Sequence, residues 1–323
     1  MKVFITGGAG FIGSHLAERL LADGAHVMVL DDLSTGAMAN IDHLVDHKRF
    51  THRIGSVIDA PLVAEFVDRC DITVHLAAAV GVRLIVEQPV HTIETNVHGT
   101  EVVLDAVAKK RKRVLLASSS EVYGKSQSVP FSEEDDLVMG PTTHSRWSYA
   151  CSKALDEWLG LAYHREKGVP VTVARFFNVV GPRQTGSYGM VLPTLAGQAV
   201  AGRPITVYGS GEQSRCFAHV RDVVEAVLAL LHEPSAIGEV FNVGSDSEVT
   251  INELAAKVRE AADSDSPIVH IPYDEAYAEG FEDMDRRVPD LSKLARAIGF
   301  KPSTPLEEII ADVVAEQRAA LQG

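Results

Sequence analysis

Residues 6–15 read Thr-Gly-Gly-Ala-Gly-Phe-Ile-Gly-Ser-His (TGGAGFIGSH), with four glycines within seven positions. The apolar run MKVFI before them predicts a strand, and HLAERLLADG after them predicts a helix that ends at Gly24. Glycine lets the chain turn tightly there and lets backbone N–H groups approach a ligand. Because a helix N-terminus favours an anion, the stretch predicts a cradle for the pyrophosphate of a dinucleotide. A purely structural glycine turn is the alternative.

A carboxylate at the end of the next strand favours the dinucleotide interpretation. The run HVMVLDD predicts a strand that ends at Asp31, 18 residues after Gly13. A carboxylate at this place binds the ribose hydroxyls of NAD and repels the 2′-phosphate of NADP. Neither Arg nor Lys occurs in the adjoining DDLSTGAMAN. The sequence therefore predicts NAD as the cofactor.

Strands and helices alternate through the first half of the chain. Further strands are predicted for ITVHLAA, RVLLASSS and PVTVARFFN, and two long amphipathic helices for roughly 88–109 and 145–167. This alternation predicts an α/β fold with a doubly wound parallel sheet, which binds ligands at the carboxyl ends of its strands.

After about residue 176 the pattern loosens into loops, short strands and amphipathic helices. We therefore expect an NAD-binding domain over 1–176 and a smaller α/β lobe over 177–323 that binds the substrate. Some segments of this lobe are expected to return to the main sheet.

Bulk properties indicate a soluble enzyme. The chain has 323 residues and a net charge of −14, which argues against a nucleic-acid-binding surface. Its three cysteines are widely separated, so neither a disulfide framework nor a metal site is expected. No leading apolar segment resembles a signal peptide and no run approaches the length of a membrane span. We expect a cytoplasmic protein without a metal and without a membrane partner.

Two clusters carry residues suited to proton transfer. One is SSSEVYG at 118–124, directly after a predicted strand, and the other is YACSK, with Tyr149 and Lys153 four residues apart. On one helix face, the ammonium can lower the pKa of the phenol from about 10 toward neutrality. A tyrosinate so placed can take a proton from a sugar hydroxyl as hydride leaves for a nicotinamide, and Ser119 can hold the same oxygen.

The ordered motifs resemble a known superfamily. TGGAGFIGSH, DDLSTG, HLAA, ASSSEVYG, YACSK, RFFNVVGPRQ and YGSGEQSRCFAHVRDV together are similar to the extended short-chain dehydrogenase/reductases that act as nucleotide-sugar epimerases, dehydratases and decarboxylases. The resemblance implies a Rossmann fold, bound NAD and transient oxidation of the sugar at C4. Ser56 departs from the pattern, because relatives commonly have an acidic residue there that contacts adenine. We therefore expect weaker adenine contacts at this position.

The resemblance also implies roles for individual residues. Tyr149 would be the catalytic base, Lys153 its electrostatic partner and a ligand of the nicotinamide ribose, and Ser119 the residue that positions the hydroxyl. The predicted catalytic residues are Tyr149, Lys153, Ser119, Ser120 and Glu121. The predicted cofactor contacts are Gly7, Gly10, Phe11, Ile12, Gly13, Asp31, Leu76, Ala77, Ala78, Asn96, Tyr149 and Lys153. The predicted contacts to a nucleotide-diphosphate sugar, UDP-linked by resemblance, are Asn178, Tyr208, Arg215 and Arg287.

Three reactions are open once C4 is oxidised. Glu121 before Val-Tyr-Gly, the segment RWSYA at 146–150 and Arg287 are similar to UDP-glucuronate decarboxylases. HLAAAVGVRLIVEQP at 75–89 is more similar to UDP-sugar 4-epimerases. A 4,6-dehydratase is third, because Ser120 stands where such enzymes have an aspartate. Decarboxylation is the preferred hypothesis, and a purely structural Glu121 bonded to backbone N–H groups would favour the epimerase.

Two further expectations concern assembly and catalysis. The resemblance implies a homodimer in which the two long helices pair across a two-fold axis, and Val102, Val103, Ala106, Leu159 and Leu161 would supply its apolar surface. A non-catalytic sensor or scaffold with the same fold predicts loss of Tyr149 or Lys153, and both are present.

Overall fold

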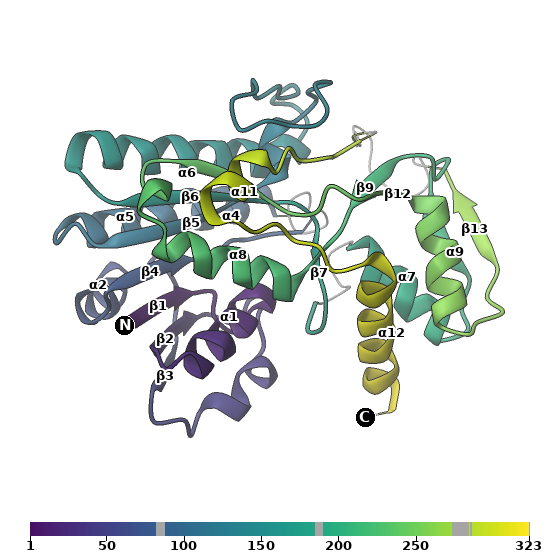
Figure 1. The fold of residues 1–323 in the computed structure, drawn as a ribbon, viewed down its shortest axis with the longest axis horizontal. Coiled ribbons are helices and arrows are strands. Elements are labelled where there is room, and N and C mark those ends of the chain that lie inside the picture. Colours follow the sequence, from purple (N-terminus) through teal and green to yellow (C-terminus); the bar gives the residue numbers. More distant parts are fainter. Residues whose placement is uncertain (82–87, 185–189, 273–283, 285, 323) are drawn as a thin grey trace.

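The computed structural model describes residues 1–81, 88–184, 190–272, 284 and 286–322. Within these residues the main sheet has seven strands, all parallel, in the order β11-β6-β5-β4-β1-β2-β3 (Figure 1). The strands are β1 (Lys2–Thr6), β2 (His26–Asp31), β3 (Phe50–Ile54), β4 (Ile72–His75), β5 (Arg113–Ser119), β6 (Val171–Phe176) and β11 (Val240–Val243). The predicted doubly wound α/β fold is confirmed, and the strand order reverses at β1, where such sheets bind ligands.

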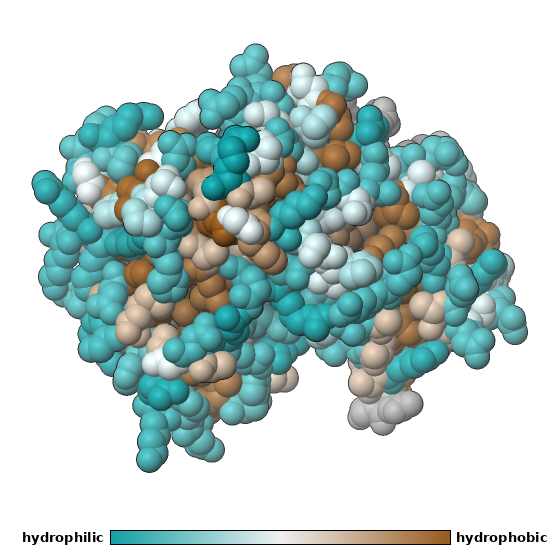
Figure 2. Space-filling model, viewed as in Figure 1, coloured by the Kyte–Doolittle hydropathy of each residue, from teal (hydrophilic) through white to brown (hydrophobic). Residues whose placement is uncertain are grey.

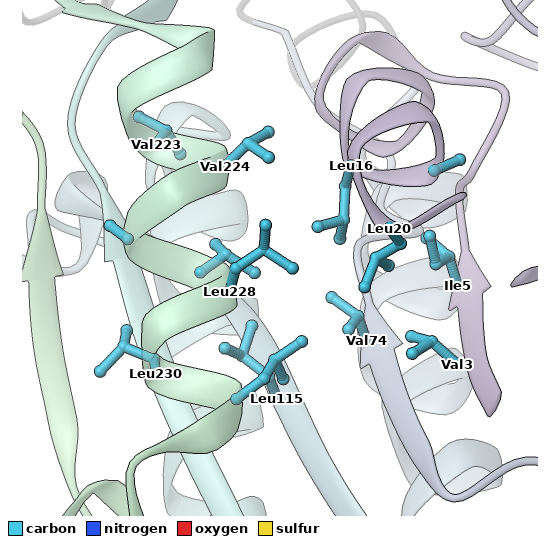
Figure 3. Close-up of a cluster of buried hydrophobic side chains, with 14 of the residues drawn as sticks. Val3, Ile5, Leu16, Leu20, Val74, Leu115, Val223, Val224, Leu228 and Leu230 are labelled. Atoms are coloured by element: carbon cyan, nitrogen blue, oxygen red, sulfur yellow. The ribbon is translucent and has the colours of Figure 1, made fainter. Parts of the chain in front are cut away.

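Alternate residues of each strand face opposite sides of the sheet and build two separate cores. On β1, Val3 and Ile5 belong to one core and Phe4 to the other. The first core packs under α1 (Phe11–Ala22) and α8 (Val220–His232), where Leu16, Leu20 and Leu228 meet (Figure 3). The second core packs under α2 (Ala60–Arg69), α5 (Gly99–Ala108) and α6 (Arg146–Lys167). Both faces of the parallel sheet are therefore covered.

The first of the two long predicted helices is interrupted. It consists of α4 (Pro89–Ile93), a π-helical turn (Glu94–His98) and α5. A π turn inserts an extra residue into the helical repeat and changes which side chains face inward. The second is a single helix, α6, and Gly168 ends it in the left-handed conformation with φ of +67°.

Segments from the second half of the chain contribute to both parts of the molecule. β11 and α8 belong to the main sheet and its covering layer. A third core lies away from the sheet between α7 (Val191–Val200), α9 (Ile251–Ala261) and α12 (Leu306–Gln322), at the right of Figure 1. The domain boundary at 176/177 stays a prediction.

Short elements complete the described chain. Three two-stranded pairs are β8 (Ile205–Tyr208) with β13 (Ile268–Ile271), β9 (Ser214–Cys216) with β12 (Glu248–Thr250), and β7 (Val179–Val180) with β10 (Ala218–His219). The remaining helices are α11 (Ser292–Ile298) and the 3₁₀ turns Met38–Asn40, Asp42–Leu44, Ser120–Tyr123 and Pro234–Ala236.

On the face shown in Figure 2, hydrophilic residues predominate and hydrophobic residues lie in groups between them. Among the described residues, no helix is long and apolar enough to cross a membrane. The three cysteines are free; Cys70 and Cys216 are buried, and Cys151 is exposed on α6.

The structure corrects three of the five residues predicted for the dimer surface, whereas Leu159 and Leu161 on α6 are half-buried. Val102, Val103 and Ala106 are buried in the second core, because α2 packs against α5 and covers them. The large exposed apolar side chains on these helices are instead Val90 and Ile93 on α4 and Leu155 and Trp158 on α6. Trp158 is 60% exposed, which makes it the largest uncovered apolar group of the four.

Candidate active site

The glycine loop between β1 and α1 excludes a side chain at two of its positions, Gly7 and Gly13. Gly7 has φ of +73°, and a Cβ there would lie 2.7 Å from the backbone nitrogen of Ala77 on the neighbouring strand connection. A Cβ on Gly13 would lie 2.2 Å from the backbone oxygen of Gly7. The start of α1 has no side-chain cap, which leaves backbone donors at the helix N-terminus for an anion.

Asp31 ends β2 beside this loop, as the sequence predicts. One carboxylate oxygen accepts a hydrogen bond from the backbone N–H of Ala9 at 2.9 Å, and the other accepts one from Leu33 at 2.8 Å. Burial raises the pKa of Asp31, and the two backbone hydrogen bonds oppose that rise. These bonds fix the carboxylate in place and leave acceptor capacity for ribose hydroxyls.

The cradle and Asp31 open into a cavity of about 510 Å³. Gly55 and Val57 line this cavity, but Ser56, where relatives commonly have an acidic residue that contacts adenine, does not. The glycine loop that excludes side chains, the uncapped helix start and the fixed carboxylate form the set of groups that a dinucleotide needs. The residues present therefore fit NAD.

Tyr149 and Lys153 lie one turn apart on α6 and both line the same cavity. They are 7% and 3% exposed. Burial raises the pKa of Tyr149, while the Lys153 charge and a hydrogen bond with Ser119 lower it, and the net pKa is above 10.0. The expected direction of the Lys153 effect is confirmed, but the expected net fall of the Tyr149 pKa toward neutrality is wrong, because desolvation of the phenolate is the larger effect.

Glu121 joins two arginines across the cavity wall. Arg287 Nη1 lies 2.6 Å from Glu121 Oε1, and Arg146 Nη2 lies 3.1 Å from Oε2. Burial alone would raise the pKa of Glu121, but Arg287 and Arg146 lower it to about 2. Glu121 is therefore ionised at neutral pH and is no proton donor there. The alternative in which it binds backbone N–H groups is not what the structure shows, since its partners are guanidinium groups.

The predicted substrate contacts converge on the same cavity from the second half of the chain. Asn178, with φ of +33°, donates its side-chain amide to the backbone oxygen of Cys216 at 2.9 Å. Arg215 donates to the backbone oxygen of Ser214 at 2.7 Å and lies near enough to Glu121 to lower its pKa. The two arginines and Tyr208 give this end of the cavity cationic and aromatic groups that suit a nucleotide diphosphate.

Comparison with known proteins adds an independent observation. A family model described as GDP-mannose 4,6 dehydratase matches residues 4–313. The UDP-N-acetyl-alpha-D-glucosaminuronate decarboxylase of Bacillus cytotoxicus is 41% identical over 318 residues, which cover 97% of this chain and 96% of the relative.

The chain belongs to the nucleotide-sugar branch of the extended short-chain dehydrogenase/reductase family. It is an enzyme of this NAD-dependent family.

Two further members show how broad the likeness is. UDP-glucuronic acid decarboxylase 1 of Xenopus tropicalis is 36% identical, over 95% of this chain and 70% of the relative. The solved UDP-glucose 4-epimerase of Thermotoga maritima is 28% identical, with a TM-score of 0.89 over 99% of this chain and all of that one. The fold is thus shared between enzymes with different reactions, so the reaction has to be argued from the site.

Eighteen of the predicted site residues of this family member line one cavity, and Asn96 does not. Asn96 is fully buried in the π-helical turn, accepts a hydrogen bond from the backbone N–H of Ala79 at 2.8 Å and donates to Ser152 Oγ at 3.2 Å. It therefore holds the backbone next to Ala78, which does line the cavity. The residues that line it are Gly7, Gly10, Phe11, Ile12, Gly13, Asp31, Leu76, Ala77, Ala78, Ser119, Ser120, Glu121, Tyr149, Lys153, Asn178, Tyr208, Arg215 and Arg287.

Three charged residues were missing from the predicted set: Asp32 and Arg146, which line the cavity, and Asp156, which binds Lys153. Arg146 stands three residues before Tyr149, so its place on the same helix face was a usable signal. Asp156 stands three residues after Lys153 and binds its ammonium, which the amphipathic pattern of α6 did not reveal.

Part of the predicted sugar-proximal loop, residues 82–87 of 75–89, lies outside the described residues. Among those described, no cluster of His, Cys, Asp or Glu is suited to hold a metal ion.

Proposed function

We propose that this enzyme decarboxylates a UDP-linked uronate. The observation that carries the proposal is the Glu121–Arg146–Arg287 cluster in the same cavity as Tyr149 and Lys153. The named decarboxylase activities of two relatives that match nearly the whole chain support it.

The charge of the cavity suits such a substrate. Among the described residues that line this end of the cavity, Arg146, Arg215 and Arg287 are cationic and Glu121 is anionic. A guanidinium binds carboxylate and phosphate oxygens through paired N–H donors and stays charged at any relevant pH. Because Glu121 is ionised, it holds Arg146 and Arg287 in place through two ion pairs.

NAD, when bound, would accept a hydride from sugar C4 and return it later. Tyr149 would take the proton of the C4 hydroxyl, Ser119 would hold the same oxygen, and Lys153 would stabilise the phenolate. A ketone at C4 makes the carboxylate on C5 that of a β-keto acid. Its C–C bond can then break, because the electron pair moves toward the ketone oxygen, where Tyr149 and Ser119 donate hydrogen bonds. Carbon dioxide leaves, and a proton from the solvent takes its place on C5. When the C4 ketone is reduced again, Tyr149 returns its proton to the C4 oxygen.

Products distinguish this reaction from its alternative. Purified enzyme with NAD would be incubated separately with UDP-glucuronate, UDP-N-acetylglucosaminuronate and UDP-glucose, and the products analysed by mass spectrometry. The proposal expects loss of carbon dioxide from at least one uronate. A product of unchanged mass and altered chromatographic position would instead establish the 4-epimerase, which the likeness to the Thermotoga maritima enzyme favours.

Arg287 and its neighbour Arg286 provide a matched pair of variants. Arg287 is buried against Glu121, whereas Arg286 pairs with Glu248 on the surface and is 56% exposed. Arg287→Met should weaken uronate turnover by at least about tenfold, the effect of one lost charged hydrogen bond, and Arg286→Met should leave it unchanged. Equal effects of the two would contradict the role of Arg287.

We also propose that the enzyme is a cytoplasmic homodimer. The exposed apolar side chains Val90, Ile93, Leu155 and Trp158 on α4 and α6 support a helix-to-helix interface between two copies. The three free cysteines are compatible with a reducing compartment.

A further inference from the structure

The catalytic lysine has a carboxylate partner that the proposed reaction does not use. Lys153 Nζ lies 2.8 Å from Asp156 Oδ2, and the two side chains are 4% and 3% exposed. Lys153 lines the cavity, but Asp156 does not. Asp156 therefore approaches the ammonium from behind the cavity wall. Its other oxygen, Oδ1, makes no hydrogen bond within the described residues.

The neighbouring ionisable groups of Glu157 and His75 do not form an ion pair with Lys153 in place of Asp156. Glu157, the next residue, is bound by Arg175 through Nη2–Oε2 at 2.7 Å and Nε–Oε1 at 2.9 Å. His75 on β4 is fully buried, and burial together with the Lys153 charge lowers its pKa to about 3, so it is neutral. Among the described residues, the ionisable groups that act on the Lys153–Asp156 pair are Tyr149 and Glu157 on α6 and His75 on β4, and Glu121 in the 3₁₀ turn after β5 acts on Tyr149.

We propose that Asp156 is a positioning residue for the catalytic pair. It binds the Lys153 ammonium on the side away from the cavity and weakens the attraction between that ammonium and the Tyr149 phenolate. It thereby sets how readily the phenol loses its proton. The inference rests on Tyr149 and Lys153 acting together and is independent of which sugar is converted.

The direction of the effect follows from the charges. The negative charge of Asp156 raises the pKa of Tyr149, and the positive charge of Lys153 lowers it. Burial lowers the pKa of Lys153, but Asp156 and Tyr149 outweigh burial, and the net pKa is above 10.5. When Asp156 is neutralised, Glu157 and the ionising Tyr149 still raise the pKa of Lys153. Removal of the Asp156 charge therefore makes Tyr149 easier to ionise.

The ionisation of Tyr149 can be followed without substrate. The tyrosinate absorbance near 295 nm would be titrated against pH in the NAD-loaded enzyme, and the titration of a Tyr149→Phe variant subtracted to isolate this one phenol. Asp156 lies seven residues from Tyr149 on α6, about 10 Å along the helix axis. Asp156→Asn, with its own Tyr149→Phe blank, should therefore shift the midpoint downward by about one pH unit, the effect of one charge at that distance at an effective dielectric constant of about 20.

Two further variants make the test specific. Glu166→Gln removes one negative charge from the exposed end of the same helix and should leave the midpoint unchanged. Asp156→Ser, smaller and neutral, should reproduce the downward shift and replaces the asparagine variant if that one does not fold. An unchanged or upward midpoint in the folded Asp156 variants would overturn the proposal. Since no nucleotide sugar is used, this result is separate from the success or failure of the decarboxylase proposal.

Discussion

Replacing Glu121 by glutamine tests the charge cluster on which the proposed reaction depends. The pKa of Glu121 falls from 4.5 to about 2 in the folded enzyme. At about 1.4 kcal/mol per pKa unit, folding favours its ionised form by roughly 3 kcal/mol. Since the side chain is only 15% exposed, solvent screens little of this. Glu121→Gln removes the negative charge that Arg146 and Arg287 both bind, so the free energy of unfolding should fall by about 3 kcal/mol at neutral pH.

The pH dependence gives the sign of the effect independently. A carboxylate whose pKa is depressed in the folded state stabilises the protein above its unfolded pKa, and this contribution is lost as pH falls from about 4.5 toward 2. The difference in free energy of unfolding between wild type and Glu121→Gln should therefore have its full value at pH 7.5. At pH 3.5 it should be smaller by about 1.4 kcal/mol, because the wild type has lost that part of its own stability.

Urea unfolding at pH 7.5 and pH 3.5 measures both quantities, and thermal unfolding at pH 7.5 should show a midpoint lower by about 4 °C for a chain of this length. Glu308→Gln is the matched control, because Glu308 also lies 2.6 Å from an arginine nitrogen, that of Arg221, but is 51% exposed. Glu308→Gln should lower the free energy of unfolding by no more than about 1 kcal/mol. Equal losses of unfolding free energy in the Glu121 and Glu308 variants would refute the reasoning. So would a loss in the Glu121 variant that does not change with pH.

Further predictions concern the cofactor, the chemistry and the assembly. Tyr149→Phe should slow oxidation of the bound sugar by a factor of about 10² to 10⁴, measured as nicotinamide absorbance at 340 nm in a single turnover, and an unchanged rate would exclude Tyr149 as the base. Asp31→Asn should weaken NAD binding about tenfold by calorimetry, through loss of charged hydrogen bonds to ribose, and equal affinity would remove Asp31 from the site. Trp158→Asp should convert dimer to monomer in light scattering, with Val45→Asp, exposed away from α4 and α6, as the control. A dimeric Trp158 variant would place the interface elsewhere.

Local rules were sufficient for the part of the site that depends on backbone geometry. The glycine loop after β1 and Asp31 at the end of β2 follow from a strand, a turn and a helix in sequence, and the structure shows them in those places. Tyr149 and Lys153 were placed together because residues four apart share a helix face. The arginines came from the resemblance, and the structure brings Arg215 and Arg287 to the same cavity.

Packing decided what the sequence could not predict. Val102 is apolar and helical whether it faces a second copy or α2, so only the tertiary structure shows that α2 covers it. Asn96 faces inward because a π-helical turn changes the phase of the helix. The pKa of Tyr149 depends on the degree of burial and on the distance of Asp156 from Lys153, and neither quantity can be read from residue spacing.

Release of the carboxyl carbon tests the central claim most directly. UDP-glucuronate and UDP-N-acetylglucosaminuronate, each labelled with ¹³C at the carboxyl carbon, would be incubated with the NAD-loaded enzyme in sealed tubes and followed by ¹³C NMR. A decarboxylase predicts that the label of at least one of them appears as carbon dioxide and bicarbonate while the uronate signal declines. Label that remains in a uronate, with the sugar epimerised at C4 or left unchanged, would contradict the account.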